Sequence, residues 1–168
     1  MRILALCGSL QARSGNLTLL ETAARRAPAG VTITVFDGVR HLPPFDPDIE
    51  AHGEHAAVAA FRRELSSSDA VLIASPEYGH SLSGSLKNAI DWVIGTAELE
   101  QKIVAITCAV PHPERGRMGL AALRGTLGAV SATIAFDEPI VKGPGFEAAI
   151  DAAVLTLVAA IEERRRAS

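Results

Sequence analysis

The sequence predicts a single doubly wound α/β domain over residues 1–168, with a five-stranded parallel sheet between two helical layers. Its 168 residues suit one domain with one core. Apolar runs alternate with amphipathic segments along the whole chain, as in repeated βα units. With 48% hydrophobic and 21% charged residues, the composition is that of a globular protein rather than a disordered one.

Five short apolar runs are the expected strands. Several are apolar at consecutive positions, as is typical of parallel strands that helices cover on both faces. They are residues 3–7, 31–36, 70–75, 103–108 and, less regularly, 131–136.

The remaining segments carry apolar residues on one face at helical spacing. The expected helices are residues 17–27, 54–65, 84–95, 117–130 and 146–161. Residues 41–55 are expected to form a loop, because their prolines remove backbone donors and disfavour helix at the preceding residues. The arginines at 164–166 are expected to complement the dipole of the last helix.

Charge and composition exclude several classes of partner. A net charge of −3 gives no electrostatic reason to expect nucleic acid, whose binding proteins are generally basic. No apolar run approaches the ~18 residues of a membrane span, and residues 3–7 are too short for a signal peptide. Cys7 and Cys108 provide neither a disulfide framework nor a zinc site. We therefore expect a cytoplasmic protein without nucleic-acid, membrane or metal partners.

The stretch "RILALCGSLQARSGN", residues 2–16, permits two interpretations. Cys7 and Arg13 enclose five residues and Ser14 follows, which is the spacing of a phosphatase nucleophile loop. Alternatively, the segment is a turn before a helix, whose N-terminal amides would hold a phosphate without cleaving it. Ser9, Ser14 and Asn16 would add side-chain donors to that site, and Arg13 a charge.

The phosphatase interpretation has two weaknesses. Small tyrosine phosphatases resemble this chain in Cys7, Arg13 and Ser14, but they carry Gly-Asn where Ser9-Leu10 stands here. Their general acid lies in an Asp-Pro-Tyr stretch near the C-terminus, for which this chain offers only Asp137. The phosphate-holding interpretation is therefore favoured.

The segment "SPEYGHSLSGSLKNAIDWV", residues 75–93, carries a longer motif. Together with the first loop it resembles the NADPH-dependent FMN reductase family of flavodoxin-like proteins. The matching residues are Gly8, Ser9, Leu10, Ser14 and Asn16 in the first motif, and Pro76, Glu77, Tyr78, Ser81, Gly84, Leu86, Lys87, Asn88, Ala89, Ile90, Asp91 and Trp92 in the second. The resemblance covers essentially the whole chain and implies a flavodoxin-like fold.

The resemblance also implies a set of residues that would bind the FMN cofactor. The phosphate would be held by the first loop, the ring would lie along the motif that begins at Pro76, and the loop after the fourth strand would close the other side. The implied residues are Ser9, Gln11, Arg13, Ser14, Gly15, Asn16, Pro76, Glu77, Tyr78, Gly79, Val110, Pro111 and His112.

Some positions depart from the family pattern. Gln11 stands where Arg is usual, which removes a phosphate charge partner unless Arg13 replaces it. Gly79 replaces Asn, which removes a side-chain contact to the flavin. Ser83 replaces Pro and is expected to loosen entry into the following helix. Ala109-Val110-Pro111 stands where glycine-rich sequence is usual.

The implied activity is that of an NAD(P)H-dependent, FMN-containing oxidoreductase. NADPH or NADH would give a hydride to flavin N5, and the electrons would pass in a ping-pong cycle to a flavin, quinone, azo dye or metal oxyanion. No catalytic side chain is expected, because the cofactor carries the chemistry. A phosphatase using Cys7 and Arg13, a one-electron carrier and a non-catalytic flavodoxin-like binding domain are the alternatives.

Other residues permit a functional and a structural interpretation. Glu77 is expected to position its neighbours, and His80 to be an exposed loop histidine rather than a proton donor to a quinone. His112, Arg115 and Arg117 are candidates for contacts to NADPH phosphates or are ordinary solvated loop residues. The family resemblance implies a homodimer or homotetramer. The candidate subunit contacts, with a solvated helix face as the alternative, are Lys87, Asn88, Asp91 and Trp92.

Overall fold

The computed structural model describes residues 1–53 and 55–167 and confirms the predicted α/β fold. All five strands of the main sheet are parallel, in the order β2-β1-β3-β4-β6. Their bounds are Arg2–Cys7 (β1), Thr32–Phe36 (β2), Ala70–Ala74 (β3), Ile103–Thr107 (β4) and Thr133–Asp137 (β6). Each expected apolar run therefore forms a strand, with ends that differ by one or two residues.

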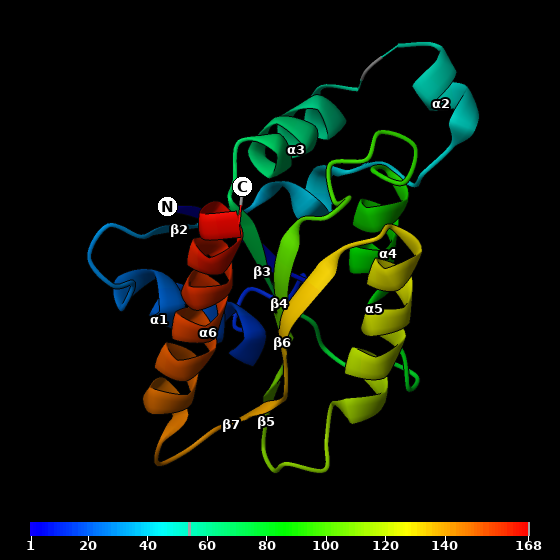
Figure 1. Ribbon diagram of the computed structural model, residues 1–168. Helices are drawn as coiled ribbons and strands as arrows, with labels where there is room; N and C mark the ends of the chain where they lie inside the picture. Colours follow the sequence, from blue (N-terminus) through cyan, green and yellow to red (C-terminus); the bar gives the residue numbers. More distant parts are fainter. Residues whose placement is uncertain (54, 168) are drawn as a thin grey trace.

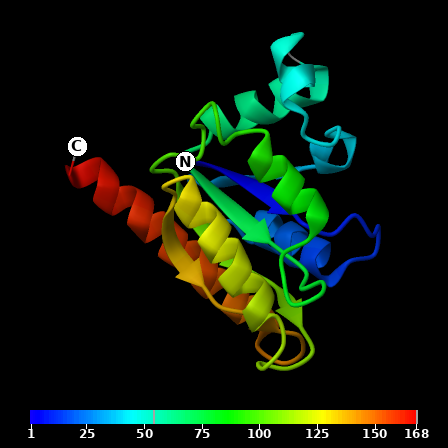
Figure 2. The same ribbon diagram turned by 90° about the vertical axis from the view of Figure 1, so that its right-hand side faces the viewer.

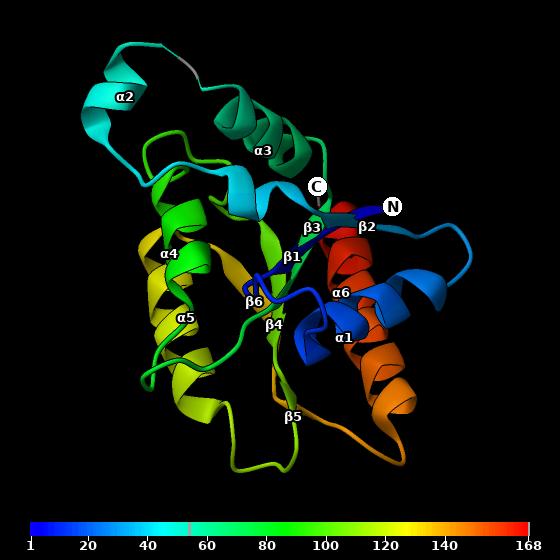
Figure 3. The same ribbon diagram turned by 180° about the vertical axis from the view of Figure 1, so that it is seen from behind.

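Helices cover both faces of this sheet and give the molecule three layers (Figure 1). One face carries α1 (Gly15–Arg25) and α6 (Phe146–Ala167), and the opposite face carries α3 (Ala56–Ser66), α4 (Gly84–Asp91) and α5 (Arg117–Ala129), as Figure 3 shows from behind. Both faces are apolar because successive strand side chains alternate between them. Leu4 and Leu6 of β1 join the core under α3, α4 and α5, whereas Ile3 and Ala5 join the core under α1 and α6.

The prediction of a loop over residues 41–55 is wrong in part. A 3-10 turn, η1 (Gly38–His41), precedes this segment and ends within it, and a short helix, α2 (Pro47–Ala51), interrupts it. Asp46 caps α2 by accepting a hydrogen bond from the Asp48 amide at 2.9 Å. Pro47 occupies the first turn, where its missing donor costs nothing. Residue 54 lies outside the described residues, and the helix expected from there begins at Ala56.

α2 lies at the opposite end of the molecule from the loop that joins β5 to α5 (Figures 1 and 2). None of its residues is buried. Among the residues that the structure describes, no helix is both long and apolar enough to cross a membrane.

Two short strands were missed by the sequence analysis. β5 (Ala109–Val110) and β7 (Ile140–Val141) pair in parallel and form a small second sheet beyond the ends of β4 and β6. Strands of two residues are too short for a periodic pattern to indicate them. Their pairing brings the chain after β6 next to the loop after β4.

Part of the predicted subunit interface on α4 contacts the chain's own loop instead. The Trp92 indole donates to the Pro43 carbonyl at 2.8 Å. The Asn88 side-chain nitrogen donates to the same carbonyl at 2.9 Å, and the Asn88 side-chain oxygen accepts from the Phe45 backbone amide at 2.7 Å. Phe45 packs edge-on against the Trp92 ring, with centroids 5.1 Å apart. Asn88 and Trp92 therefore fix the loop before α2, whereas Lys87 and Asp91 pair with each other on the surface.

We predict that Asn88→Ala lowers the free energy of unfolding by about 1–2 kcal/mol, because the Phe45 amide loses its acceptor and Pro43 one of its donors. Urea denaturation measures this change. Lys87→Ala is the matched control on the same helix and should stay within about 0.5 kcal/mol, since it breaks only an exposed ion pair. Equal unfolding midpoints for the two variants would contradict the assigned role.

Candidate functional site

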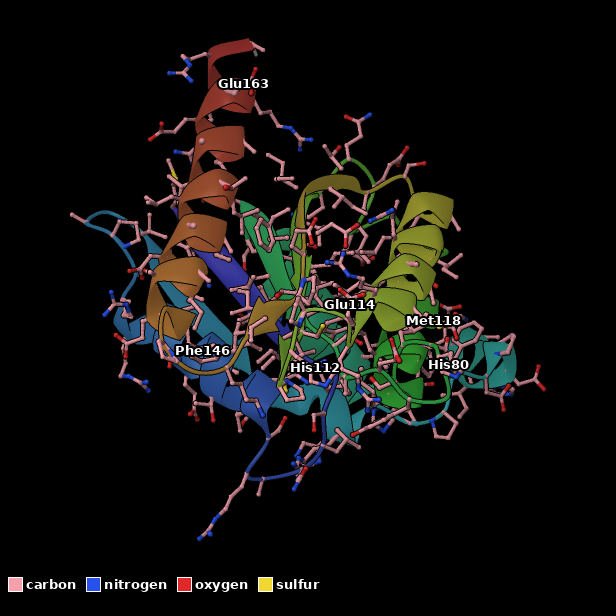
Figure 4. All side chains as sticks on the ribbon, turned by 90° about the horizontal axis from the view of Figure 1, so that it is seen from below. His80, His112, Glu114, Met118, Phe146 and Glu163 are labelled. Atoms are coloured by element: carbon pink, nitrogen blue, oxygen red, sulfur yellow. The ribbon has the colours of Figure 1, made fainter. Side chains whose placement is uncertain are left out.

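The carboxyl ends of β1, β3 and β4 meet at one edge of the sheet, because the strands are parallel. Figure 4 looks onto this edge and shows His80, His112 and Met118 gathered around it. Ligands of doubly wound folds bind outside this edge. The loops that leave these strands carry all the residues that the sequence analysis assigned to the cofactor.

The first loop packs tightly against the loop after β3. The Gly8 amide donates to the Ala74 carbonyl at 2.8 Å, and the Ser85 hydroxyl donates to the Gly8 carbonyl at 3.0 Å. A Cβ on Gly8 would lie 2.8 Å from the Ser83 hydroxyl oxygen, so only glycine fits without a shift. Gly8 thus allows the loop after β1 to lie in direct contact with the loop after β3.

Ser83 corrects one expectation from the sequence. It is the N-cap residue of α4, and its hydroxyl accepts a hydrogen bond from the Leu86 amide at 3.4 Å. A capping serine stabilises a helix start by satisfying an amide that has no partner within the helix. Where the family has proline, this chain therefore has a serine that caps the start of α4.

The start of α1 is built to receive an anion. Ser14 is its N-cap residue and accepts from the Asn16 amide at 3.2 Å, while the Ser9 hydroxyl accepts from the Gln11 amide at 3.3 Å. Ser9, Ser14 and Asn16 are buried, and Gln11 is exposed. The first turn of α1 has no acidic residue, so nothing neutralises the partial positive charge of the helix start.

Asn16 also connects this helix start to the loop after β4. Its side-chain oxygen accepts a hydrogen bond from the Ala109 amide at 2.8 Å. Within the described part of the chain its side-chain nitrogen has no partner, so that group remains a donor for a ligand. Asn16 therefore positions two segments of the site, a role that the sequence analysis did not assign to it.

Residues 78–81 form a tight turn. Tyr78 and Ser81 exchange two backbone hydrogen bonds of 3.0 Å, and between them Gly79 and His80 have φ values of 56° and 62°. Two successive left-handed residues are typical of a type I′ turn, in which Gly and Asn are favoured. Gly79 therefore suits the backbone at the position where the family has Asn. The turn leaves Tyr78 57% exposed at the edge of the site.

Glu77 joins this turn to the start of α5. Its carboxylate accepts a hydrogen bond from the Gly119 amide at 3.0 Å. A Cβ on Gly119 would lie 3.0 Å from the Glu77 Cβ, so glycine at this position allows α5 to pack closely against Glu77. Glu77 therefore has a positioning contact, as the sequence analysis expected. Its partner Gly119 was missed, because an isolated glycine in a helical pattern does not indicate which residue packs against it.

The loop after β4 closes the third side of the site. Val110 is buried in the small sheet, whereas Pro111 and His112 are exposed. Gly116 is the N-cap residue of α5 and has a φ of 86°, a conformation that favours glycine. It also packs directly on the Cys108 sulfur, which leaves no room for a Cβ. Arg117, a candidate for NADPH contacts, lies 3.5 Å from the Glu138 carboxylate and is partly neutralised by it.

Neither cysteine has the environment of a nucleophile. Burial raises the pKa of the Cys7 thiol, and the thiol donates to the Ser9 carbonyl at 3.4 Å. Burial raises the pKa of Cys108 to about 12, and the neighbouring carboxylates of Glu77 and Asp137 add to this shift. A phosphatase needs a thiolate with a lowered pKa. The arrangement therefore opposes the phosphatase interpretation of Cys7 and Arg13.

Donor chemistry, rather than cavity size, makes this edge the candidate site. The hollow beside the first loop, lined by Cys7, Ser9, Gln11 and other residues, measures only about 110 Å³. Larger hollows of about 460 and 510 Å³ lie between α1 and α6 and around α2, and another of about 590 Å³ lies at the start of α6. Tyr78 and Met118 are exposed on the segments at this edge, and their side chains suit a flat ring on an open platform.

These residues fit an FMN group. The phosphate would meet the acid-free helix start and its serine and amide donors. The ring would lie on the turn at residues 78–81 and against the loop after β4. Met118, 55% exposed at the start of α5, would add an apolar contact that the sequence analysis did not single out.

The sequence is similar to those of known flavin and quinone reductases. An NAD(P)H-dependent FMN reductase of Pseudomonas aeruginosa is 36% identical over 121 residues, which cover 72% of this chain and 64% of the relative. An NAD(P)H:quinone oxidoreductase of Solanum tuberosum is 40% identical over 96 residues, and a quinone reductase of Escherichia coli 34% over 94 residues. Each match covers 55% of this chain, and 49% and 50% of the respective relatives. The matched segments thus span between half and two thirds of these relatives' lengths.

Solved structures resemble the fold over almost the whole chain. The flavoenzyme NAD(P)H:(acceptor) oxidoreductase of Paracoccus denitrificans superposes with a TM-score of 0.80 at 22% identity, covering 94% of this chain and 97% of the other. An NADH:FMN oxidoreductase in its apo form gives a TM-score of 0.70 at 16% identity, covering 94% and 89%. The family model for NADPH-dependent FMN reductases matches residues 1–143. The chain belongs to the NADPH-dependent FMN reductase family.

Proposed function

We propose that the protein is an FMN-dependent oxidoreductase that uses NADPH or NADH. The observation that carries this proposal is the acid-free start of α1, held against the loop after β4 by the bond between Asn16 and Ala109. This arrangement supplies a phosphate site beside a platform for a flat ring. Family membership identifies the phosphate-bearing group as FMN.

Each segment would have a separate task. The residues that would surround the phosphate are Ser9, Gln11, Arg13, Ser14, Gly15 and Asn16. Pro76 to Gly79 would meet the polar edge of the ring through their backbone, and Val110 to His112 would close the opposite side. Bound FMN would supply hydride and electron transfer at N5, so the protein's task is to bind, orient and cover it.

The open platform suits a ping-pong cycle in which the nicotinamide and the acceptor bind in turn. Tyr78, His80 and Met118 are exposed at the edge and would contact either substrate. Quinones are the favoured acceptor class, because several relatives are named quinone reductases. Flavins, azo dyes and metal oxyanions remain alternative acceptors. We further propose a cytoplasmic homodimer or homotetramer, as the family resemblance implies.

We predict that the purified protein binds FMN and shows flavin absorbance bands in the visible. NADPH or NADH added without oxygen should bleach these bands, and a quinone should restore them. A spectrophotometric titration followed by anaerobic reduction measures both steps. Failure to bind FMN would end the proposal, and binding without bleaching would favour a one-electron carrier or a non-catalytic binding domain.

We predict that neither Cys7 nor Cys108 reacts with iodoacetamide at neutral pH in the folded protein, because both thiols are buried and protonated. Mass spectrometry after labelling, with urea-unfolded protein as the control, measures this. Rapid labelling of Cys7 alone, with aryl phosphate hydrolysis that Cys7→Ser abolishes, would restore the phosphatase interpretation.

The same burial predicts a loss of stability at alkaline pH. Unfolded Cys108 ionises near its ordinary pKa of 9.0, whereas folded Cys108 ionises only near 12. The unfolded state therefore releases its proton first, and the free energy of unfolding falls as pH rises from about 9 toward 12. Urea denaturation across this range, with Cys108→Ala as the comparison, should give a shallower decline in the variant. Identical slopes would contradict the raised pKa.

We predict that Glu77→Ala weakens FMN binding and lowers the free energy of unfolding by about 1–3 kcal/mol, because the Gly119 amide loses its acceptor. Glu77→Gln keeps an acceptor oxygen at the same place and should retain most of both quantities. Flavin fluorescence titration and urea denaturation measure them. Equal loss in the Ala and Gln variants would show that the charge, rather than the hydrogen bond, matters.

A further inference from the structure

Lys142 lies directly over the first residue of α1. A Cβ placed on Gly15 would be 2.5 Å from both the Cε and the Nζ of Lys142. The absence of a side chain at residue 15 therefore leaves the space that the lysine occupies. This brings an ammonium group to the helix start that the proposed function assigns to a phosphate.

The backbone holds Lys142 in this place. Its amide donates to the Val110 carbonyl at 2.8 Å, which continues the pairing of β5 with β7. The neighbouring Ala109 amide donates to the Asn16 side chain at 2.8 Å. The small second sheet thus joins Lys142 to the same helix start through two hydrogen bonds, although residues 16 and 142 are far apart in the sequence.

Lys142 has no counter-charge in the described part of the chain. The sequence contains three lysines. Lys87 pairs with Asp91, and Lys102 donates to the Leu65 and Ser68 carbonyls at 2.9 and 2.8 Å. Lys142 is exposed, and the first turn of α1 offers it no carboxylate. A cation beside the positive end of a helix dipole is unfavourable unless an anion lies between them.

We propose that the Lys142 ammonium is a charge partner of the cofactor phosphate, an inference that rests on the proposed function. A phosphate monoester carries a charge of roughly −1.5 to −2 at neutral pH, and lysine binds it as a compact point charge. Gln11 supplies no charge where the family has arginine. Lys142 reaches the same helix start from the segment after β7 and supplies a positive charge there.

Titrations with FMN and with riboflavin, which lacks the phosphate, test this role. In Lys142→Gln the Kd for FMN should rise roughly tenfold to a hundredfold, while the Kd for riboflavin should change less than about twofold. The dependence of FMN affinity on salt should also become less steep, because one charge contact is lost. Lys142→Arg should retain most of the affinity. Lys87→Gln, which removes the same charge elsewhere, is the matched control and should bind FMN as the wild type does.

Gly15→Ala gives a second, independent measurement. The added methyl group would displace the flexible end of Lys142, so it should weaken FMN binding in the wild type and have less effect when Lys142 is already Gln. Thermal melts followed by circular dichroism establish that each variant is folded.

The outcomes separate the two proposals. A wild type that binds neither FMN nor riboflavin would end the proposed function itself. FMN binding by the wild type with an unchanged Kd in Lys142→Gln would overturn only the role of Lys142. Equal weakening of FMN and riboflavin would also overturn that role, because it would show a general structural defect.

Discussion

The hydrogen bond from the Ala109 amide to the Asn16 side chain is the contact on which the rest of the site depends. Parallel strands bring the loops after β1 and β4 to the same edge of the sheet, but they do not fix the loops relative to each other. Asn16 does so from the first turn of α1, close to its N-cap residue Ser14. The small sheet of β5 and β7 then extends the same connection to the chain after β6.

A second connection runs on the other face of the sheet. Glu77 accepts a hydrogen bond from Gly119 and so fixes the turn after β3 relative to α5. Gly8, packed against Ser83, fixes the first loop relative to the start of α4. The starts of α1, α4 and α5 are thereby held around one edge, and the first turn of α1 has no acidic residue. Such an edge favours an anionic ligand and leaves room for a flat ring beside it.

The sequence predicted the sheet well, because strands buried on both faces need long apolar runs that are easy to see at residues 3–7, 70–75 and 103–108. The motifs that resemble a known family lie in the loops after β1 and β3, which the structure brings to one edge of the sheet. The sequence-based expectations were less accurate where one residue type is compatible with two different local structures. Proline indicated a loop at residues 41–55 but also starts α2, and serine at position 83 caps a helix that proline could also begin. Lys142 could not be predicted, because its position depends on pairing between two-residue strands.

Hydrogen–deuterium exchange with and without FMN tests most directly whether these loops form one cofactor site. With FMN bound, we expect slower exchange in the loop at residues 8–16, the turn at 76–81, the segment 109–112 and the residues around Lys142. The hollows between α1 and α6 and around α2 should exchange as before. Protection at those hollows instead, or in only one of the loops, would contradict this expectation.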